Sequence, residues 1–231
     1  MENKTLPTKE QYFQGKRIVI TGGAGGIGSA LTNMFSGIGA EVIILDVTDI
    51  DKPEKEETNR SHYAVDVSNK DNLTATATNL DEVDILIIAA GATSQTNEPT
   101  QEEMDRMKRV NVDGVQNTLS AFESRMKKGS QIVFIGTDNP PKDFYRETKE
   151  EDRRIVSSFA QEHPDFNVRT ILLGPVRTPL FKLGKPPEAI QQIAENVGMY
   201  EPSEFAEALS DLLMKPQSTP YQEEKMYRPL E

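Results

Sequence analysis

A tyrosine and a lysine stand four residues apart in the stretch DFYRETKEED, residues 143–152. Tyr145 and Lys149 would lie on one face of a helix, because positions i and i+4 stack on each other. A free tyrosine has a pKa of about 10, so proton transfer near neutral pH needs a nearby positive charge. The spacing fits such a pair, and it also fits two side chains on a solvated helix.

The stretch TGGAGGIGSA, residues 21–30, has the composition of a phosphate-binding turn. It follows a short apolar run rich in β-branched residues and precedes residues with helical spacing. Glycines in this context allow a tight bend and a close approach of the backbone to a pyrophosphate, while the helix N-terminus offers free N–H groups. A flexible turn is the alternative. The candidate phosphate-binding residues are Gly22, Gly26, Ile27 and Gly28.

An aspartate, Asp46, ends the second apolar run, some twenty residues after this turn. At this position an acid bonds the hydroxyls of the adenosine ribose, and its charge would repel a 2′-phosphate. The first basic residue after it is Lys52. The sequence therefore favours NAD over NADP, although an aspartate is also common at a turn after a strand.

Strands and helices alternate from residue 17 to about residue 215 with no break in composition. The strands are apolar on both faces, which is typical of a parallel sheet covered on both sides. We predict a single doubly wound α/β domain of the Rossmann type over residues 15–215, with a polar N-terminal arm (1–14) and a C-terminal tail (216–231). Strands are expected at 17–22, 41–47, 63–67, 83–92, 130–137 and 167–175, and helices at 27–40, 69–80, 100–110, 112–127, 145–163, 187–198 and 202–214.

Composition excludes several classes of function. The net charge of −11 argues against nucleic acid or an anionic membrane as a partner, because phosphate binding needs a basic surface. The chain has no cysteine, and its two histidines, His62 and His163, are far apart, so we expect no disulfide and no metal site. It has neither an apolar run long enough to span a membrane nor the apolar core of a signal peptide, and we expect a cytoplasmic protein.

Several features in order resemble the short-chain dehydrogenase/reductase family, in its one-domain TGxxxGxG and YxxxK branch. The resemblance runs from about Gly15 to Leu180. The glycine turn matches the first signature, and Tyr145 with Lys149 matches the second. Between and after them stand Asp66-Val67 for the adenine-contacting pair, IAAG at 88–91 for NNAG, Asn111 for the structural and proton-relay asparagine, Thr137 for the catalytic serine, and Pro175, Val176 and Thr178 for the nicotinamide carboxamide segment.

The resemblance implies an NAD(H)-dependent oxidoreductase that interconverts a secondary alcohol and a ketone. Tyr145 would be the acid/base, Lys149 would lower its proton affinity and bind the cofactor ribose, Thr137 would bond the substrate oxygen, and Asn111 would hold a water. The expected catalytic residues are Asn111, Thr137, Tyr145 and Lys149. The expected NAD-binding residues are Gly22, Gly26, Ile27, Gly28, Asp46, Asp66, Val67, Ala90, Gly91, Tyr145, Lys149, Pro175, Val176 and Thr178.

Departures from the family pattern support an alternative, a dinucleotide-binding regulator with little or no catalysis. Thr137 replaces a serine, and its β-methyl restricts the rotamers of the hydroxyl. Ile88 and Ala89 replace two asparagines, and the connection from Thr137 to Tyr145 is shorter than usual. A dinucleotide-dependent epimerase or dehydratase is a third, less favoured interpretation. The sequence does not identify the alcohol or ketone substrate, whose specificity is expected in residues 138–144 and 179–200.

The helix after Lys149 is unusually charged. Residues 150–154 read EEDRR, where the family usually has small and apolar residues that pack against a second subunit. We expect the acids of 147–152 to be solvated. The C-terminal QSTPYQEEKMYRPLE also lacks the family's glycine-rich closing strand. We therefore expect a homo-oligomer in which a dimer is favoured over a tetramer.

Overall fold

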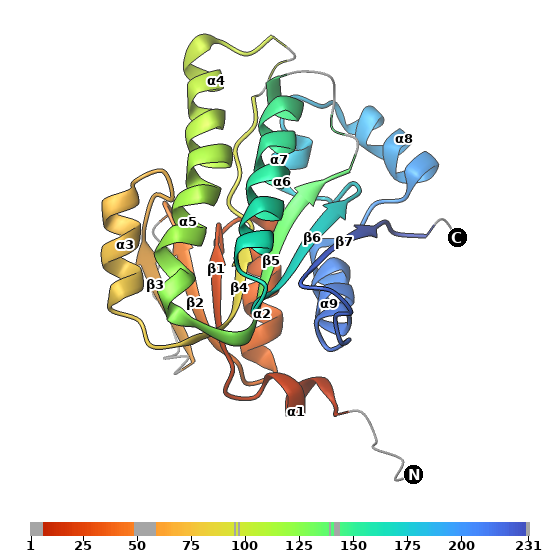
Figure 1. Ribbon diagram of the computed structural model, residues 1–231. Coiled ribbons are helices and arrows are strands. Elements are labelled where there is room, and N and C mark those ends of the chain that lie inside the picture. The colour runs from red at the N-terminus through yellow and green to blue at the C-terminus, as the bar shows by residue number, and fades with distance from the viewer. Residues whose placement is uncertain are drawn as a thin grey trace.

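The computed structural model describes residues 7–48, 59–94, 96, 98–138, 140 and 144–229. In this part of the chain seven strands form one parallel sheet in the order β3-β2-β1-β4-β5-β6-β7, with helices on both faces (Figure 1). This confirms the predicted doubly wound α/β fold. The strands are β1 (Arg17–Thr21), β2 (Glu41–Asp46), β3 (Arg60–Ala64), β4 (Val83–Ile88), β5 (Met126–Thr137), β6 (Asn167–Leu173) and β7 (Tyr221–Met226).

Two apolar layers sandwich the sheet, one against each face. Helices α3, α5 and α6 cover one face, and α1, α2 and α9 cover the other. The helices are α1 (Lys9–Phe13), α2 (Gly26–Gly37), α3 (Lys70–Thr78), α4 (Gln101–Met107), α5 (Gly114–Phe122), α6 (Phe144–Glu162), α7 (Pro179–Lys182), α8 (Pro187–Val197) and α9 (Pro202–Leu213).

Strand β1 shows why the central strands are apolar throughout. Its residues Ile18 and Ile20 pack into the layer of α2 and α9, whereas Val19 packs into the opposite layer. Successive side chains of a strand point to opposite faces, so a strand covered on both sides must be apolar at every position. The same rule explains EVIILD in β2 and VDILII in β4, which the sequence identified as strands.

The strand order reverses between β1 and β4, and this reversal positions the functional residues. In such sheets ligands bind outside the carboxyl ends of the strands at the point where the order changes. The hydroxyl of Thr21, at the end of β1, accepts hydrogen bonds from the backbone N–H groups of Ala89 (3.2 Å) and Ala90 (3.3 Å). This fixes the chain leaving β4 beside the glycine turn that follows β1.

The expected polar arm over residues 1–14 needs correction for the part that the structure describes. Lys9–Phe13 is a short helix, and the Thr8 side chain caps it by accepting a hydrogen bond from the backbone of Gln11. Phe13 is fully buried, and its ring centroid lies 5.0 Å from that of Phe35 in α2. One aromatic residue in a polar stretch therefore ties this segment to the core.

The expected tail over residues 216–231 is also corrected, because Tyr221–Met226 forms β7, parallel to β6. An edge strand needs only backbone hydrogen bonds on one side and little apolar burial, so its sequence, YQEEKM, lacks the usual strand pattern. Glu223 of β7 adds an ion pair with Arg153 of α6. The opposite edge strand β3 is polar as well, and it lies at Arg60–Ala64 rather than at the expected 63–67.

The two helices expected at 100–110 and 112–127 form one continuous rod in Figure 1. A π-helical turn over Lys108–Asp113 joins α4 to α5 without a break, and a short 3₁₀ turn over Glu123–Arg125 follows α5. Among the described residues, none of the helices combines the length and apolar character needed to cross a membrane.

Candidate functional site

Three of the four expected catalytic residues, Thr137, Tyr145 and Lys149, line a pocket of about 460 Å³ at the carboxyl ends of β4, β5 and β6, whereas Asn111 lies outside this lining. Thr137 is the last residue of β5, and Tyr145 lies in the first turn of α6. Their hydroxyl oxygens are 3.3 Å apart, within hydrogen-bond distance. The connection between them is short, and it still brings the two hydroxyls together at the wall of one pocket.

Lys149 lies one helical turn after Tyr145 and is buried. Its ammonium nitrogen is 5.8 Å from the centroid of the Tyr145 ring and 5.5 Å from that of Phe134. Gly91 borders the same nitrogen, since a Cβ added there would lie 4.0 Å from it. The ammonium group therefore lies beside the Tyr145 ring, within the lining of the same pocket.

A buried carboxylate, Asp152, holds this lysine. The Lys149 Nζ donates a 2.8 Å hydrogen bond to Asp152 Oδ2, and the Asp152 side chain is 0% exposed. The other carboxylate oxygen, Oδ1, is buried without a hydrogen-bond partner. Our expectation that the acids of 147–152 are solvated is wrong for Asp152, because it stands at i+3 from Lys149 and so shares its inward face.

Burial and the attraction between the two charges have opposite effects on the pKa of each member of this pair. Burial raises the pKa of Asp152 to about 6, although the charge of Lys149 opposes the rise. Burial alone would lower the pKa of Lys149, but the charges of Asp152 and Tyr145 outweigh it and raise that pKa. Both members are therefore charged near neutral pH.

Asn111 lies in the π-helical turn and is fully buried. Its amide nitrogen donates to the carbonyl of Ala92 (3.0 Å) and to the Thr148 hydroxyl (3.0 Å), and its oxygen accepts from the N–H of Ala92 (2.8 Å). The Thr148 hydroxyl in turn donates to the carbonyl of Tyr145. The side chain thus joins the segment after β4 to the turn of α6 that carries Tyr145.

The glycine turn has the close backbone approaches that its sequence suggests. Gly22 has a φ of +68°, a conformation that favours glycine. A Cβ on Gly28 would lie 2.0 Å from the carbonyl oxygen of Gly22, so no other residue fits there. The N-cap of α2 is Gly25, which offers no side-chain acceptor, so the first-turn N–H groups remain available to phosphate oxygens.

Asp46 faces this turn from the end of β2. Its Oδ2 accepts a 3.0 Å hydrogen bond from the N–H of Ala24, and its Oδ1 accepts a 2.9 Å bond from the N–H of Thr48. A carboxylate has about four acceptor positions, so these two bonds leave capacity for ribose hydroxyls. The side chain therefore shapes the glycine turn and presents negative charge next to it.

The other expected cofactor residues fall into two groups. One group lines the pocket of Thr137 and Tyr145, and the other does not. The lining includes Ile27, Ala90, Gly91, Pro175, Val176 and Thr178, whereas Asp66 and Val67 lie beyond it, with Asp66 exposed and Val67 buried. The Thr178 hydroxyl accepts from the N–H of Phe181 and so caps α7.

Tyr227 is among the pocket-lining residues that the sequence did not indicate. It follows β7, and its ring packs so closely on Gly174 that a Cβ there would lie 2.6 Å away. Its hydroxyl donates a hydrogen bond to the Asp138 carboxylate, which raises the pKa of Tyr227 to about 12. No pattern in the polar C-terminal sequence indicated this contact, because it depends on the pairing of β7 with β6.

Comparison with known proteins identifies the family. The model for short chain dehydrogenases matches residues 16–187, which is most of the chain. The chain therefore belongs to the short-chain dehydrogenase family, a family of oxidoreductases that bind a nicotinamide dinucleotide. This confirms the resemblance drawn from the ordered motifs.

Curated relatives are distant. The uncharacterized short-chain type dehydrogenase/reductase y4vI of Sinorhizobium fredii is 28% identical over 187 residues, covering 74% of this chain and 34% of that protein. D-xylose 1-dehydrogenase of Caulobacter vibrioides is 31% identical over 135 residues, covering 54% of each chain. This chain therefore matches about a third of the first relative's length and about half of the second's.

Solved structures share the fold at low identity. The structure of gox2181 has a TM-score of 0.78 at 22% identity and covers 94% of this chain and 96% of its own. BdcA, solved in complex with NADPH, has a TM-score of 0.77 at 20% identity and covers 95% of this chain and 97% of its own. At such identities the likeness concerns the arrangement of the sheet and helices alone.

Proposed function

We propose that the protein is an NAD(H)-dependent oxidoreductase that interconverts a secondary alcohol and a ketone. The observation that carries the proposal is the 3.3 Å approach of the Thr137 and Tyr145 hydroxyls beside the buried ammonium of Lys149. Two hydroxyls at this spacing can both bond one substrate oxygen. Nicotinamide supplies the hydride chemistry when bound, and the protein residues hold and move the proton.

In this proposal Tyr145 takes the proton from the alcohol or gives it to the ketone oxygen. Thr137 bonds the same oxygen and orients it toward the phenol. Lys149 stabilises the phenolate through its positive charge, and its ammonium would also bind the ribose of the nicotinamide half. Asn111 keeps the Tyr145 segment fixed relative to β4 through Thr148.

The residues present suit a dinucleotide. The glycine turn and the first turn of α2 would hold the pyrophosphate, and Asp46 would bind the adenosine ribose hydroxyls. Asp66 and Val67 would contact the adenine, while Pro175, Val176 and Thr178 would hold the carboxamide. The negative charge of Asp46 supports NAD over NADP, because a 2′-phosphate would meet a carboxylate.

The substrate would enter between the segment after β4 and residues 179–200. Apolar side chains from this second region, Leu180, Phe181 and Val197, line the pocket. They favour a substrate with an apolar or weakly polar body next to its alcohol carbon. We expect the protein to work as a homo-oligomer, with a dimer favoured over a tetramer.

Titration of the protein with NADH and NADPH, followed by a turnover panel, tests the proposal. We expect NADH to bind at least tenfold more tightly, since two like charges about 4 Å apart repel each other by roughly 1–4 kcal/mol and about 1.4 kcal/mol is a factor of ten in Kd. A panel of secondary alcohols with NAD should yield NADH, detected at 340 nm in a spectrophotometer by an order-of-magnitude rise above the enzyme-free rate. NADH binding without turnover on any alcohol or ketone would favour the regulator interpretation instead.

A further inference from the structure

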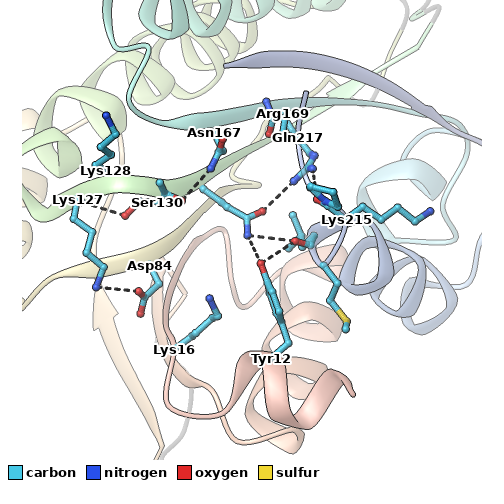
Figure 2. Close-up of a pocket in the computed structure, with 15 residues that line it drawn as sticks. Tyr12, Lys16, Asp84, Lys127, Lys128, Ser130, Asn167, Arg169, Lys215 and Gln217 are labelled. Atoms are coloured by element: carbon cyan, nitrogen blue, oxygen red, sulfur yellow. Dashed lines mark hydrogen bonds and ion pairs between the residues drawn. The ribbon is translucent and has the colours of Figure 1, made fainter. Parts of the chain in front are cut away.

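A second pocket, of about 350 Å³, lies at the amino end of the sheet (Figure 2). It is bordered by α1, by the early part of β5, by β6 and by the segment that follows α9. None of its lining residues lines the pocket of Thr137 and Tyr145. Strand β5 contributes Gln131 to this pocket and Thr137 to the other. From the rise per residue of a strand, these two residues are about 20 Å apart.

Basic side chains gather at this pocket although the chain has a net charge of −11. Its charged lining consists of Lys16, Lys127, Lys128, Arg169, Lys215 and a single acid, Asp84. Lys127 lies 3.3 Å from Asp84, and Lys128 lies 2.8 Å from Asp165. The positive charge of the pocket therefore exceeds its negative charge even after these ion pairs form.

Lys16 and Arg169 approach the pocket from opposite sides (Figure 2). The Lys16 ammonium lies 4.4 Å from the centroid of the Tyr12 ring. In the part of the chain that the structure describes, no carboxylate is within ion-pair distance of Lys16. Its charge is therefore available to a ligand.

Arg169 is the unusual residue of the pocket, because it is only 2% exposed. Its Nη1 donates to the Gln131 side-chain oxygen (3.0 Å), and its Nη2 donates to the carbonyl of Lys215 (2.8 Å). Both acceptors are neutral, and Nε is buried with no partner. Burial lowers the pKa of Arg169, and the charge of Glu224 only partly offsets this.

A buried guanidinium without a counter-charge costs free energy, so such groups are usually paired. In the part of the chain that the structure describes, no carboxylate forms an ion pair with Arg169, and a second cation, Lys16, lines the same pocket. An anion in the pocket would remove this cost by acting on both charges at once. The planar guanidinium suits phosphate and carboxylate oxygens, and the volume is at the small end of ligand pockets.

We propose that this pocket binds the phosphate or carboxylate group of a small molecule, with Arg169 and Lys16 as its cationic residues. Tyr12 joins the two sides of the site, since its hydroxyl accepts from the Gln131 side-chain amide (2.9 Å) and donates to the carbonyl of Leu213 (3.1 Å). The site rests on residues remote from the proposed dinucleotide site. Its occupancy is therefore independent of whether the protein has the proposed function.

Thermal unfolding in inorganic phosphate, succinate and ionic-strength-matched chloride tests the proposal. We expect phosphate or succinate at about 100 times its Kd to raise the Tm of the wild-type protein by roughly 5 °C above chloride. Succinate alone would identify a carboxylate ligand, and phosphate alone a phosphate ligand. Since phosphate has a second candidate site at the glycine turn, the informative part of the shift is the part that depends on Lys16.

Two variants and one control isolate that part. Lys16→Gln should weaken anion binding about tenfold, and Arg169→Gln should abolish the anion-dependent shift. Lys70→Gln removes the same charge from the exposed start of α3 and should keep the wild-type response. If Arg169→Gln does not fold, the anion-dependent Tm shift of Lys16→Gln, compared with that of Lys70→Gln, still tests the proposal. An equal response in Lys16→Gln and Lys70→Gln, or no response beyond chloride, would overturn the proposal.

Discussion

Two buried cations lie at opposite ends of the central strands, and they differ in the hydrogen-bond acceptors that surround them. At the carboxyl end, Lys149 has a buried carboxylate at 2.8 Å, supplied by Asp152 three residues later. At the amino end, Arg169 has only neutral acceptors. The first charge is balanced within the fold, and its proposed task is to act on a neighbouring phenol. The second is left unbalanced, which is why we assign it an external anion.

The comparison also shows how one departure from the family pattern can be absorbed. The acids of the charged run around Lys149 were expected to be solvated, yet one of them, Asp152, is directed into the core. Asp152 keeps Lys149 charged, because its charge raises the lysine pKa against the effect of burial. It also competes with any ribose hydroxyl for the same ammonium group. Three sets of variants test the contrast between the two cations.

The largest expected effect on stability follows from breaking the built-in pair. Lys149→Met leaves the Asp152 carboxylate buried without a counter-charge. We therefore expect the free energy of unfolding at pH 8 to fall by about 3–5 kcal/mol. The double variant Lys149→Met/Asp152→Asn removes both charges and should recover most of this loss. Urea denaturation followed by circular dichroism measures both. If the double variant is no more stable than Lys149→Met, the pair is not the cause.

A smaller effect is expected at the other end of the sheet. Arg169→Met removes a cation that has no carboxylate partner, so only two hydrogen bonds are lost. We expect the free energy of unfolding to fall by about 1–2 kcal/mol in buffer without phosphate. The same urea titration provides the value. A loss as large as that of Lys149→Met would mean that Arg169 is already balanced by the fold, and the contrast between the two cations would disappear.

A third expected effect is a difference in pH dependence. In the folded state the pKa of Asp152 is about 6, above its ordinary value of 3.8, so the folded protein binds the extra proton between these values. The contribution of the Asp152 carboxyl to the free energy of unfolding therefore falls as the pH rises from 3.8 to about 6. Asp152→Asn cannot titrate and should lack this slope.

Melting temperatures of the wild-type protein and Asp152→Asn, recorded at intervals from pH 4 to pH 7, reveal the difference. The Tm of the wild type relative to the variant should decrease through this range and then level off. A constant difference would show that the Asp152 carboxyl keeps its ordinary pKa. Asp71→Asn, on the exposed first turn of α3, is the matched control for a carboxylate-to-amide change.

The central sheet and the grouping of Thr137, Tyr145 and Lys149 could be predicted from the sequence for physical reasons. Strands covered on both faces must be apolar throughout, so RIVIT, EVIILD and VDILII were recognisable without a structure. The glycine turn was recognisable because Gly28 admits no side chain. The spacing of Tyr145 and Lys149 follows from one turn of a helix.

Other features depend on contacts that no local pattern contains. Strand β7 is polar and is held by its neighbour, and Phe13 is a single aromatic residue in a polar stretch. In the sequence Asp152 cannot be distinguished from the other acids of the charged run. Only the orientation of α6 in the fold, which buries Lys149, shows that Asp152 points inward as well. The amino-end pocket brings together residues from α1, β5, β6 and the segment after α9, which are widely separated in the sequence.

The proton-transfer role of Tyr145 is the central claim, and Tyr145→Phe tests it most directly. The substitution removes one oxygen and keeps the ring beside Lys149, so NADH affinity should stay within about twofold of wild type. Turnover of any alcohol or ketone that the wild-type protein converts should fall by roughly 10²–10⁴-fold, the usual contribution of a general acid–base group. Turnover within tenfold of wild type at unchanged NADH affinity would contradict the account.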